Sequence, residues 1–67
     1  MKIVINMAEC SACRQVLIST HVHDFRTCQC GKTAVDGGRE YLKRMGSEWT
    51  ELSVHEINGI FCRVEGA

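Results

Sequence analysis

Two closely spaced pairs of cysteines constrain the fold of this 67-residue chain more than any other feature of its sequence. Cys10 and Cys13 have two residues between them, while Cys28 and Cys30 have one and are followed by Gly31. Structural Zn²⁺ takes four tetrahedral ligands, and two tight turns side by side can each supply two thiolates. The spacing therefore predicts a zinc ribbon in which Cys10, Cys13, Cys28 and Cys30 hold one structural Zn²⁺ per chain.

The short length of the chain gives such an ion a role in folding. A domain of about 60 residues buries only about 60% of the surface that its unfolded chain exposes. Zinc supplies about 10–16 kcal/mol of folding free energy in zinc-finger peptides. Because the one-residue spacing of the second pair is the less usual one, a ligand set in which His21 or His23 replaces one thiol stays open.

The fifth cysteine, Cys62, falls in a predicted strand, where we expect a small buried residue. An alternative pairs it across the strands with His55, as half of a second metal site or as a thiol–imidazole dyad. The sequence offers no third group to orient that imidazole, and no set of nucleophile, base and orienting group elsewhere. We therefore expect that the protein is not an enzyme.

Apolar runs are too short for a membrane span or a secretory signal. A spanning helix needs about 18 apolar residues, and a signal peptide needs an apolar stretch of about 7–15. The apolar stretch near the N-terminus is shorter than either. We expect a cytoplasmic protein without membrane contact, in a compartment where thiols bind metal more often than they form disulfides.

The pattern of the chain predicts a small metal-stapled, mostly-β domain over residues 1–67: a zinc-ribbon-like antiparallel sheet, one short helix and a C-terminal β-hairpin. Residues 1–35 would form the zinc ribbon with both cysteine pairs. β-Branched and apolar residues favour strands within it at 2–6, 15–20, 25–27 and 33–35.

Residues 36–46 predict a turn followed by the short helix. Gly37 and Gly38 favour a turn, and Asp36 would be the N-cap of the helix. The helix would span residues 39–45, where Tyr41 and Met45 share a face at helical spacing.

Residues 49–65 predict the β-hairpin, which carries the clearest local signal in the chain. Asn58-Gly59 lies between two apolar runs and favours a two-residue type I′ turn. Such a turn fixes the register and places Ile57 opposite Ile60.

The eight acids and eight bases cancel in number but are unevenly distributed. Residues 14–44 hold six bases and three acids, whereas the segment from Glu48 onward holds four acids and Arg63 as its one base. Such an imbalance is typical of solvated faces; the alternatives are a basic patch that meets an acidic partner, or an acidic face that mimics phosphate. The basic segment 14–44 supports an alternative function, a zinc ribbon that binds nucleic acid. The absence of a net basic excess argues against it.

The segment from Cys10 to Arg44 resembles a family of small, uncharacterised zinc-ribbon-like proteins of phages and prophages. The resemblance is carried by Cys-x-x-Cys at 10–13, His-Asp-Phe at 23–25, Cys-x-Cys-Gly at 28–31, Ala-Val-Asp-Gly-Gly at 34–38, Tyr41 and the basic pair 43–44. One departure is Arg14, where a glycine often follows the first cysteine pair. The resemblance implies a zinc-binding protein of phage origin in the host cytoplasm, without an established activity.

We expect the protein to act by binding another protein. If it is phage-encoded, the partner would be a host protein or complex, and the effect would be inhibition, for example of a host defence system. Tyrosine and arginine are common interface anchors. The expected contact residues are Asp36, Arg39, Tyr41 and Arg44, together with the acidic Glu48 and Glu51. An exposed edge strand would also favour a homodimer.

Overall fold

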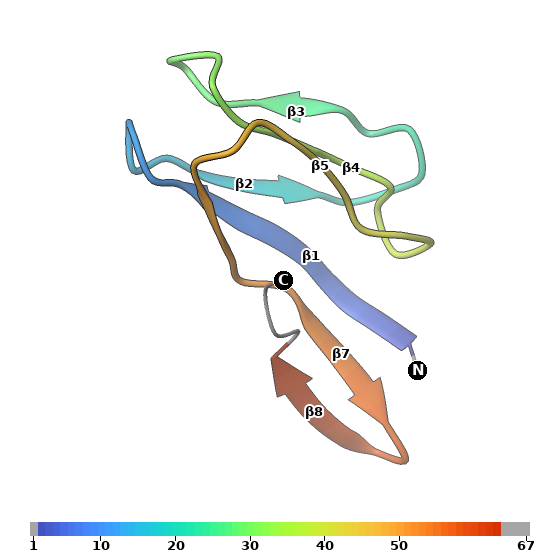
Figure 1. Ribbon diagram of the computed structural model, residues 1–67. Coiled ribbons are helices and arrows are strands. Elements are labelled where there is room, and N and C mark those ends of the chain that lie inside the picture. The colour runs from blue at the N-terminus through green and yellow to red at the C-terminus, as the bar shows by residue number, and fades with distance from the viewer. Residues whose placement is uncertain (1, 64–67) are drawn as a thin grey trace.

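The structure, a computed structural model, describes residues 2–63 as strands joined by turns and loops (Figure 1). The strands are β1 (Lys2–Cys10), β2 (Val16–Ser19), β3 (Arg26–Thr27), β4 (Ala34–Asp36), β5 (Lys43–Met45), β6 (Trp49–Glu51), β7 (Val54–Ile57) and β8 (Ile60–Arg63). They form a five-stranded sheet in the order β2-β1-β7-β8, with β6 also pairing with β1, and a three-stranded sheet in the order β3-β4-β5. All strand pairs are antiparallel. The mostly-β fold class is therefore confirmed.

Strand β1 is the centre of the larger sheet. Asn6, Ala8 and Cys10 are buried and alternate with more exposed neighbours, as expected for a strand with one face on the core. Residues 6–9 pair with β2, while the opposite edge pairs with β7 near its start and with β6 near its end. The register with β7 shifts between Ile3 and Ile5, which marks a β-bulge.

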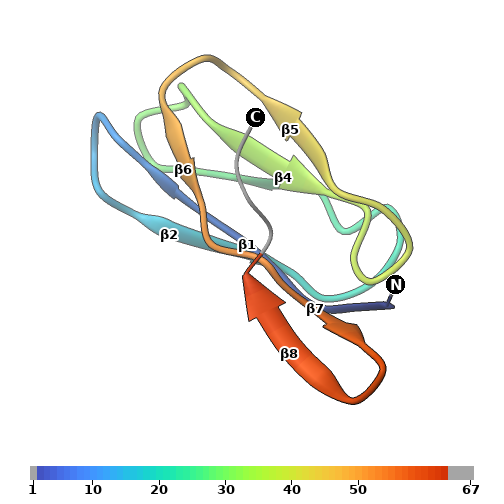
Figure 2. The same ribbon diagram turned by 60° about the horizontal axis from the view of Figure 1, so that its bottom comes forward.

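The core lies between the two sheets. Strand β4 packs over β1 and β2, so Val35 meets Ala8 and Leu17 in a buried cluster (Figures 1 and 2). Cys10 and Cys28 belong to the same cluster, and Trp49 packs against it. The apolar core therefore leads directly into the cysteine pairs.

The predicted helix over residues 39–45 is wrong: residues 2–63 contain no helix. The amides of Glu40 and Tyr41 donate to the carbonyl of Gly37, which makes a single turn. The chain then enters β5, where Lys43–Met45 pair with β4. Two helical turns cannot stand alone and need tertiary contacts. The tertiary contacts here favour a strand, because pairing with β4 directs the Arg44 side chain into a buried ion pair.

The hairpin register is confirmed, but the hairpin is shorter than predicted. Strands β7 and β8 place Ile57 opposite Ile60 and His55 opposite Cys62. Trp49–Glu51 instead pair with β1, and the chain crosses to β7 through Leu52 and Ser53. Residues 64 and 65 of the predicted hairpin, including Glu65, lie outside the described residues.

The molecule measures 37 × 21 × 16 Å. The β7–β8 hairpin projects from the rest of it (Figure 1). Strand β8 contacts β7 and no other strand of the described chain. Ile57, Ile60 and Phe61 are exposed on the hairpin, and Cys62 is half-buried outside the core. Nothing in residues 2–63 has the length and apolarity of a membrane-spanning helix.

Candidate metal centre

The four predicted cysteine ligands converge at one end of the core. The Sγ atoms of Cys10, Cys13, Cys28 and Cys30 all lie within 4.8 Å of one another. The Sγ of Cys30 lies 3.6 Å from that of Cys10 and 3.4 Å from that of Cys28. Sulfurs at tetrahedral corners about 2.3 Å from Zn²⁺ would be about 3.8 Å apart. The spacing therefore fits a single ion bound by four sulfurs.

The first pair sits on the turn that joins β1 to β2. Cys10 ends β1, and its carbonyl accepts a hydrogen bond from the Arg14 amide at 2.8 Å while its own amide donates to the Gln15 carbonyl. Arg14 has a φ of 66°, in the left-handed region that glycine adopts most easily. Position 14 is thus one at which the backbone favours glycine.

The second pair sits on the turn between β3 and β4. The Cys28 amide donates to the Thr33 carbonyl, and the Gly31 amide donates to the Cys28 carbonyl, which closes the turn. The Thr33 amide points at the Cys28 sulfur at 3.4 Å. Gln15 links the two turns, because its side-chain oxygen accepts the Gln29 amide at 2.6 Å. Neither Gln15 nor Thr33 was expected from the sequence to belong to the site.

Hydrogen bonding makes the four sulfurs unequal. The Thr33 side chain and the backbone of Cys13 lower the pKa of Cys10 to about 6. Although the Lys32 backbone favours its thiolate, hydrogen bonding with the neighbouring sulfur of Cys28 raises the pKa of Cys30 to about 12. Crowded sulfurs cannot all carry negative charge unless a cation neutralises it.

A set of four thiolates selects soft or borderline metals such as zinc, or an iron–sulfur centre. The protein itself offers four candidate ligands, and a full set of four protein ligands is typical of a structural site rather than a catalytic one. Cys10 and Cys28 are buried, Cys13 is half-buried and Cys30 is exposed, so the site lies at the edge of the core.

The alternative ligands lie apart from this cluster. His21 and His23 follow β2 in an exposed loop, and neither belongs to the cysteine group that the described residues form. The His21 ring makes a hydrogen bond with the Thr20 hydroxyl at 3.1 Å. His55 and Cys62 are cross-strand neighbours, and His55 Nδ1 is buried without a partner among the described residues. A second metal site or a dyad at that pair stays a prediction.

Two of the six expected contact residues have buried side chains. Arg44 and Glu51 form a bidentate ion pair, with Nε–Oε1 at 2.9 Å and Nη2–Oε2 at 2.7 Å, and their side chains are only 7% and 5% exposed. Their side chains therefore contact each other inside the fold, and a contact of either residue with a partner stays a prediction. Arg39, Tyr41 and Glu48 are exposed and Asp36 is half-buried.

Asn6 completes this buried polar cluster and was not expected to matter. Its Oδ1 accepts Arg44 Nη1 at 2.8 Å. Its Nδ2 lies within hydrogen-bond distance of the carbonyls of Asp36, Gly38 and Tyr41, at 2.9, 2.9 and 3.2 Å. Asn6 therefore joins β1 to the 36–41 turn. The one sequence signal was an amide among the apolar residues of a predicted strand.

Comparison with known protein families gives a match over most of the chain. The model of a family described as "Domain of unknown function (DUF7695)" matches residues 2–46. No curated protein and no solved structure matches the chain. The matched segment contains both cysteine pairs, the 36–41 turn and β5, and it ends before β6 and the hairpin.

Proposed function

The chain belongs to the DUF7695 family of domains of unknown function, and we propose that it is a structural zinc protein that acts by binding another protein. The observation that carries the zinc proposal is the closed set of four cysteine sulfurs within 4.8 Å of one another. Zinc suits this set because it has no redox chemistry and accepts four thiolates tetrahedrally. The ion would fix the turn after β1 to the turn before β4, and so one sheet to the other.

Metal analysis tests the zinc proposal. Protein purified without added metal should contain about one zinc per chain, and a chelator should unfold it. Co²⁺ in place of zinc should give the visible absorption of a tetrahedral thiolate site. Cys13→Ser should lose both the bound metal and the folded structure. Cys62→Ser, which lies outside the site, should keep both. A folded metal-free protein, or an iron–sulfur spectrum, would contradict the proposal.

Exposed apolar side chains support a binding role. Small monomers rarely leave large contiguous apolar patches in water, and such patches mark interaction sites. Ten large apolar residues in strands and loops are at least 39% exposed; they are Ile5, Val16, Ile18, Val22, Phe25, Tyr41, Met45, Ile57, Ile60 and Phe61.

The resemblance to phage proteins suggests who the partner is: a host protein or complex, whose inhibition would serve the phage. Affinity capture from the natural host tests this idea with the zinc-loaded protein as bait. A second copy of the chain, joined through an exposed edge strand, is the other partner that we propose. Light scattering over a range of concentrations would detect it, and a constant monomer mass would exclude it.

Nucleic-acid binding has less support, because four of the six bases in segment 14–44 lie within ion-pair distance of an acid. Arg14 pairs with Glu9, Arg26 with Asp24, Lys32 with Glu48 and Arg44 with Glu51. Binding that depends on phosphate contacts rises steeply at low salt. Failure to bind single- or double-stranded DNA or RNA at low salt would remove this alternative.

A further inference from the structure

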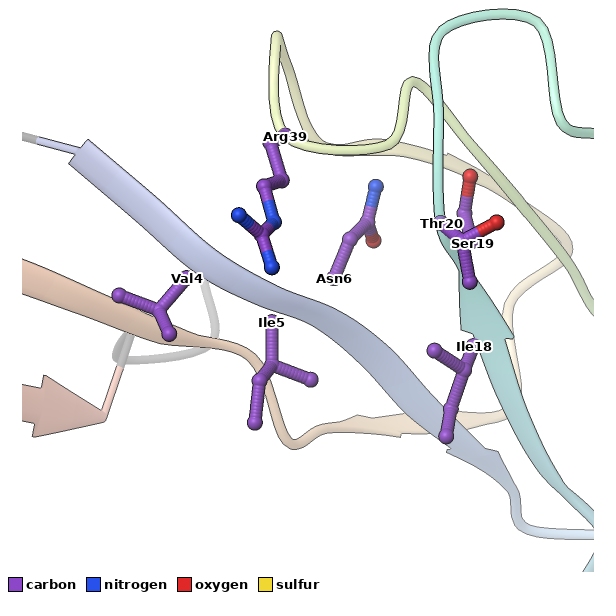
Figure 3. A pocket seen from close by; sticks show the side chains of 7 residues that line it. All are labelled: Val4, Ile5, Asn6, Ile18, Ser19, Thr20 and Arg39. Carbon is purple, nitrogen blue, oxygen red and sulfur yellow. The ribbon is translucent and has the colours of Figure 1, made fainter.

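A groove opens where β2 turns away from β1. It has a volume of about 170 Å³ and is lined by Val4, Ile5 and Asn6 of β1, by Ile18, Ser19 and Thr20 at the end of β2, and by Arg39 of the 36–41 turn (Figure 3). We propose that this groove binds an extended peptide segment with an acidic side chain, which adds to β1 as a new edge strand. This inference deepens the proposed protein-binding function and rests on it.

The first half of β1 offers an open edge to such a peptide. Strand β2 pairs with β1 only from Asn6 onward, so no strand of the described chain pairs with this edge over residues 2–5. Val4 lies in the bulge and has no register partner on β2 or on β7. Unpaired strand edges are templates for a further strand, and main-chain hydrogen bonds provide the affinity in that binding mode.

The two sides of the groove differ in chemistry. Figure 3 shows Ile5 and Ile18 pointing to one side of the sheet, while Arg39 extends from its turn towards β1 on the other side. Ile5 is 39% exposed and Ile18 is 47% exposed. Successive side chains of an added strand would point to opposite sides. An acidic residue could therefore face Arg39 while its apolar neighbours cover Ile5 and Ile18.

Arg39 is available for a carboxylate. Its side chain is exposed and has no ion-pair partner within residues 2–63, whereas Arg14, Arg26 and Arg44 are each paired with an acid. An arginine–carboxylate pair is charge-assisted and often bidentate. An internal acidic residue fits better than a chain end, because the open edge continues past the groove to Lys2.

The turn that carries Arg39 is held in place before any ligand arrives. The amide of Gly38, the preceding residue, donates to the Ser19 hydroxyl at 2.9 Å, and the Gly38 carbonyl accepts Asn6 Nδ2 at 2.9 Å. A fixed turn loses little conformational entropy when a ligand binds, which favours affinity.

The test uses the zinc-loaded protein and two amidated, acetylated peptides, Thr-Val-Glu-Val-Thr and Thr-Val-Gln-Val-Thr. Fluorescence polarisation of labelled peptides would measure affinity, and amide shifts in NMR spectra would locate the site. We expect the Glu peptide to bind about tenfold more tightly than the Gln peptide. The shifts should fall on residues 2–6, 18–20 and 38–40.

Two variants sharpen the test. Arg39→Gln should abolish the preference for glutamate, whereas Lys43→Gln, an exposed cation on β5, should keep it. Equal affinity for the two peptides, or amide shifts elsewhere on the molecule, would contradict the proposal that this groove binds an acidic peptide. A Gln peptide with a free C-terminal carboxylate that binds as well as the Glu peptide would overturn the choice of an internal acidic side chain.

Host capture separates this inference from the proposed function. If wild type and Arg39→Gln capture the same host protein equally well, the proposal that the groove binds the partner is wrong, while the proposed protein-binding function is supported. If neither captures a host protein but the peptides bind as expected, peptide binding in the groove is supported and the proposed host partner is not.

Discussion

Asn6 is buried, and the fold uses the hydrogen-bonding groups of its side chain rather than its volume. One amide group meets three carbonyls of the 36–41 turn and the guanidinium of Arg44. Only a side chain with both a donor and an acceptor can do this. A buried polar group that loses its partner costs about 1–3 kcal/mol.

Asn6→Asp should therefore destabilise the zinc-loaded protein although it preserves the shape of the side chain. The carboxylate keeps the contact with Arg44 but turns acceptor oxygens towards the three carbonyls. We expect a loss of about 2 kcal/mol or more in the free energy of urea unfolding. Asn58→Asp, in the exposed hairpin turn, is the control and should change stability by less than about 0.5 kcal/mol. Equal effects of the two substitutions would contradict this role of Asn6.

The Arg44–Glu51 pair gives a second prediction for single residues. Arg44→Ala leaves the Glu51 carboxylate buried without its partner, which should cost about 3–5 kcal/mol in urea unfolding. The double variant Arg44→Met, Glu51→Leu removes both charges and should recover much of that loss. A double variant as unstable as Arg44→Ala would show that packing, not the unpaired charge, causes the loss.

The same pair makes stability depend on pH. Although burial opposes its ionisation, hydrogen bonds from Arg44 and Ser53 lower the pKa of Glu51 below its usual value of 4.5. A lowered pKa means stability that is fully present above 4.5 and lost as the pH falls through the folded-state value. The stability difference between wild type and Glu51→Gln should stay constant from pH 7 to about 5 and shrink below about 4.5. A difference that is unchanged in acid would contradict the ion-pair contribution.

The elements of the fold differ in how far the sequence foretells them. Asn58-Gly59 fixes the β7–β8 register because a two-residue turn is a local constraint, and the close spacing within each cysteine pair is local in the same way. That spacing predicts the cluster of four sulfurs that could hold a metal ion. The helix over 39–45 was wrong because helix propensity is a weak preference that tertiary contacts override. Arg44 finds Glu51 and Asn6 only when the sheets meet, and no local pattern announces those contacts.

The turn between β4 and β5 gives a prediction at the scale of elements. Gly38 has a φ of 52°, and a Cβ there would collide with the backbone of His21. Gly59, in the hairpin turn, has a φ of 82° with nothing within 4 Å of an added Cβ. Gly59→Ala should cost about 1–2 kcal/mol from the left-handed conformation alone. Gly38→Ala should cost clearly more, because the 36–41 turn must also move away from the loop after β2; equal losses in urea unfolding would contradict this packing.

At the scale of the whole molecule, the uneven charge distribution proves to be part of the fold. The basic middle and the acidic C-terminal part meet through Lys32–Glu48 and Arg44–Glu51. The first of these pairs is exposed, and exposed pairs contribute little stability. The second is buried and joins the smaller sheet to the larger one. The charge imbalance suggested two partner surfaces. Some of these charges instead pair with each other within the chain.

Two clusters are among the contacts that join the two sheets, and this arrangement should couple the sheets. The cysteine cluster joins the end of β1 to the turn before β4, while Asn6, Arg44 and Glu51 join β1, β5 and β6. If the metal-free chain is unfolded, zinc binding includes the free energy of folding. A substitution that weakens the fold then weakens zinc binding by the same factor.

Arg44→Ala should therefore lower the apparent affinity for zinc by about a hundredfold or more, although Arg44 is not one of the cysteine ligands. The factor follows from a loss of about 3 kcal/mol, since about 1.4 kcal/mol corresponds to tenfold. Competition with a chromophoric chelator measures it, and Lys43→Ala, exposed on the same strand, should bind zinc like wild type. A loss of stability in urea without a loss of zinc affinity would mean that the chain folds before it binds metal, so that zinc binds to an already folded protein.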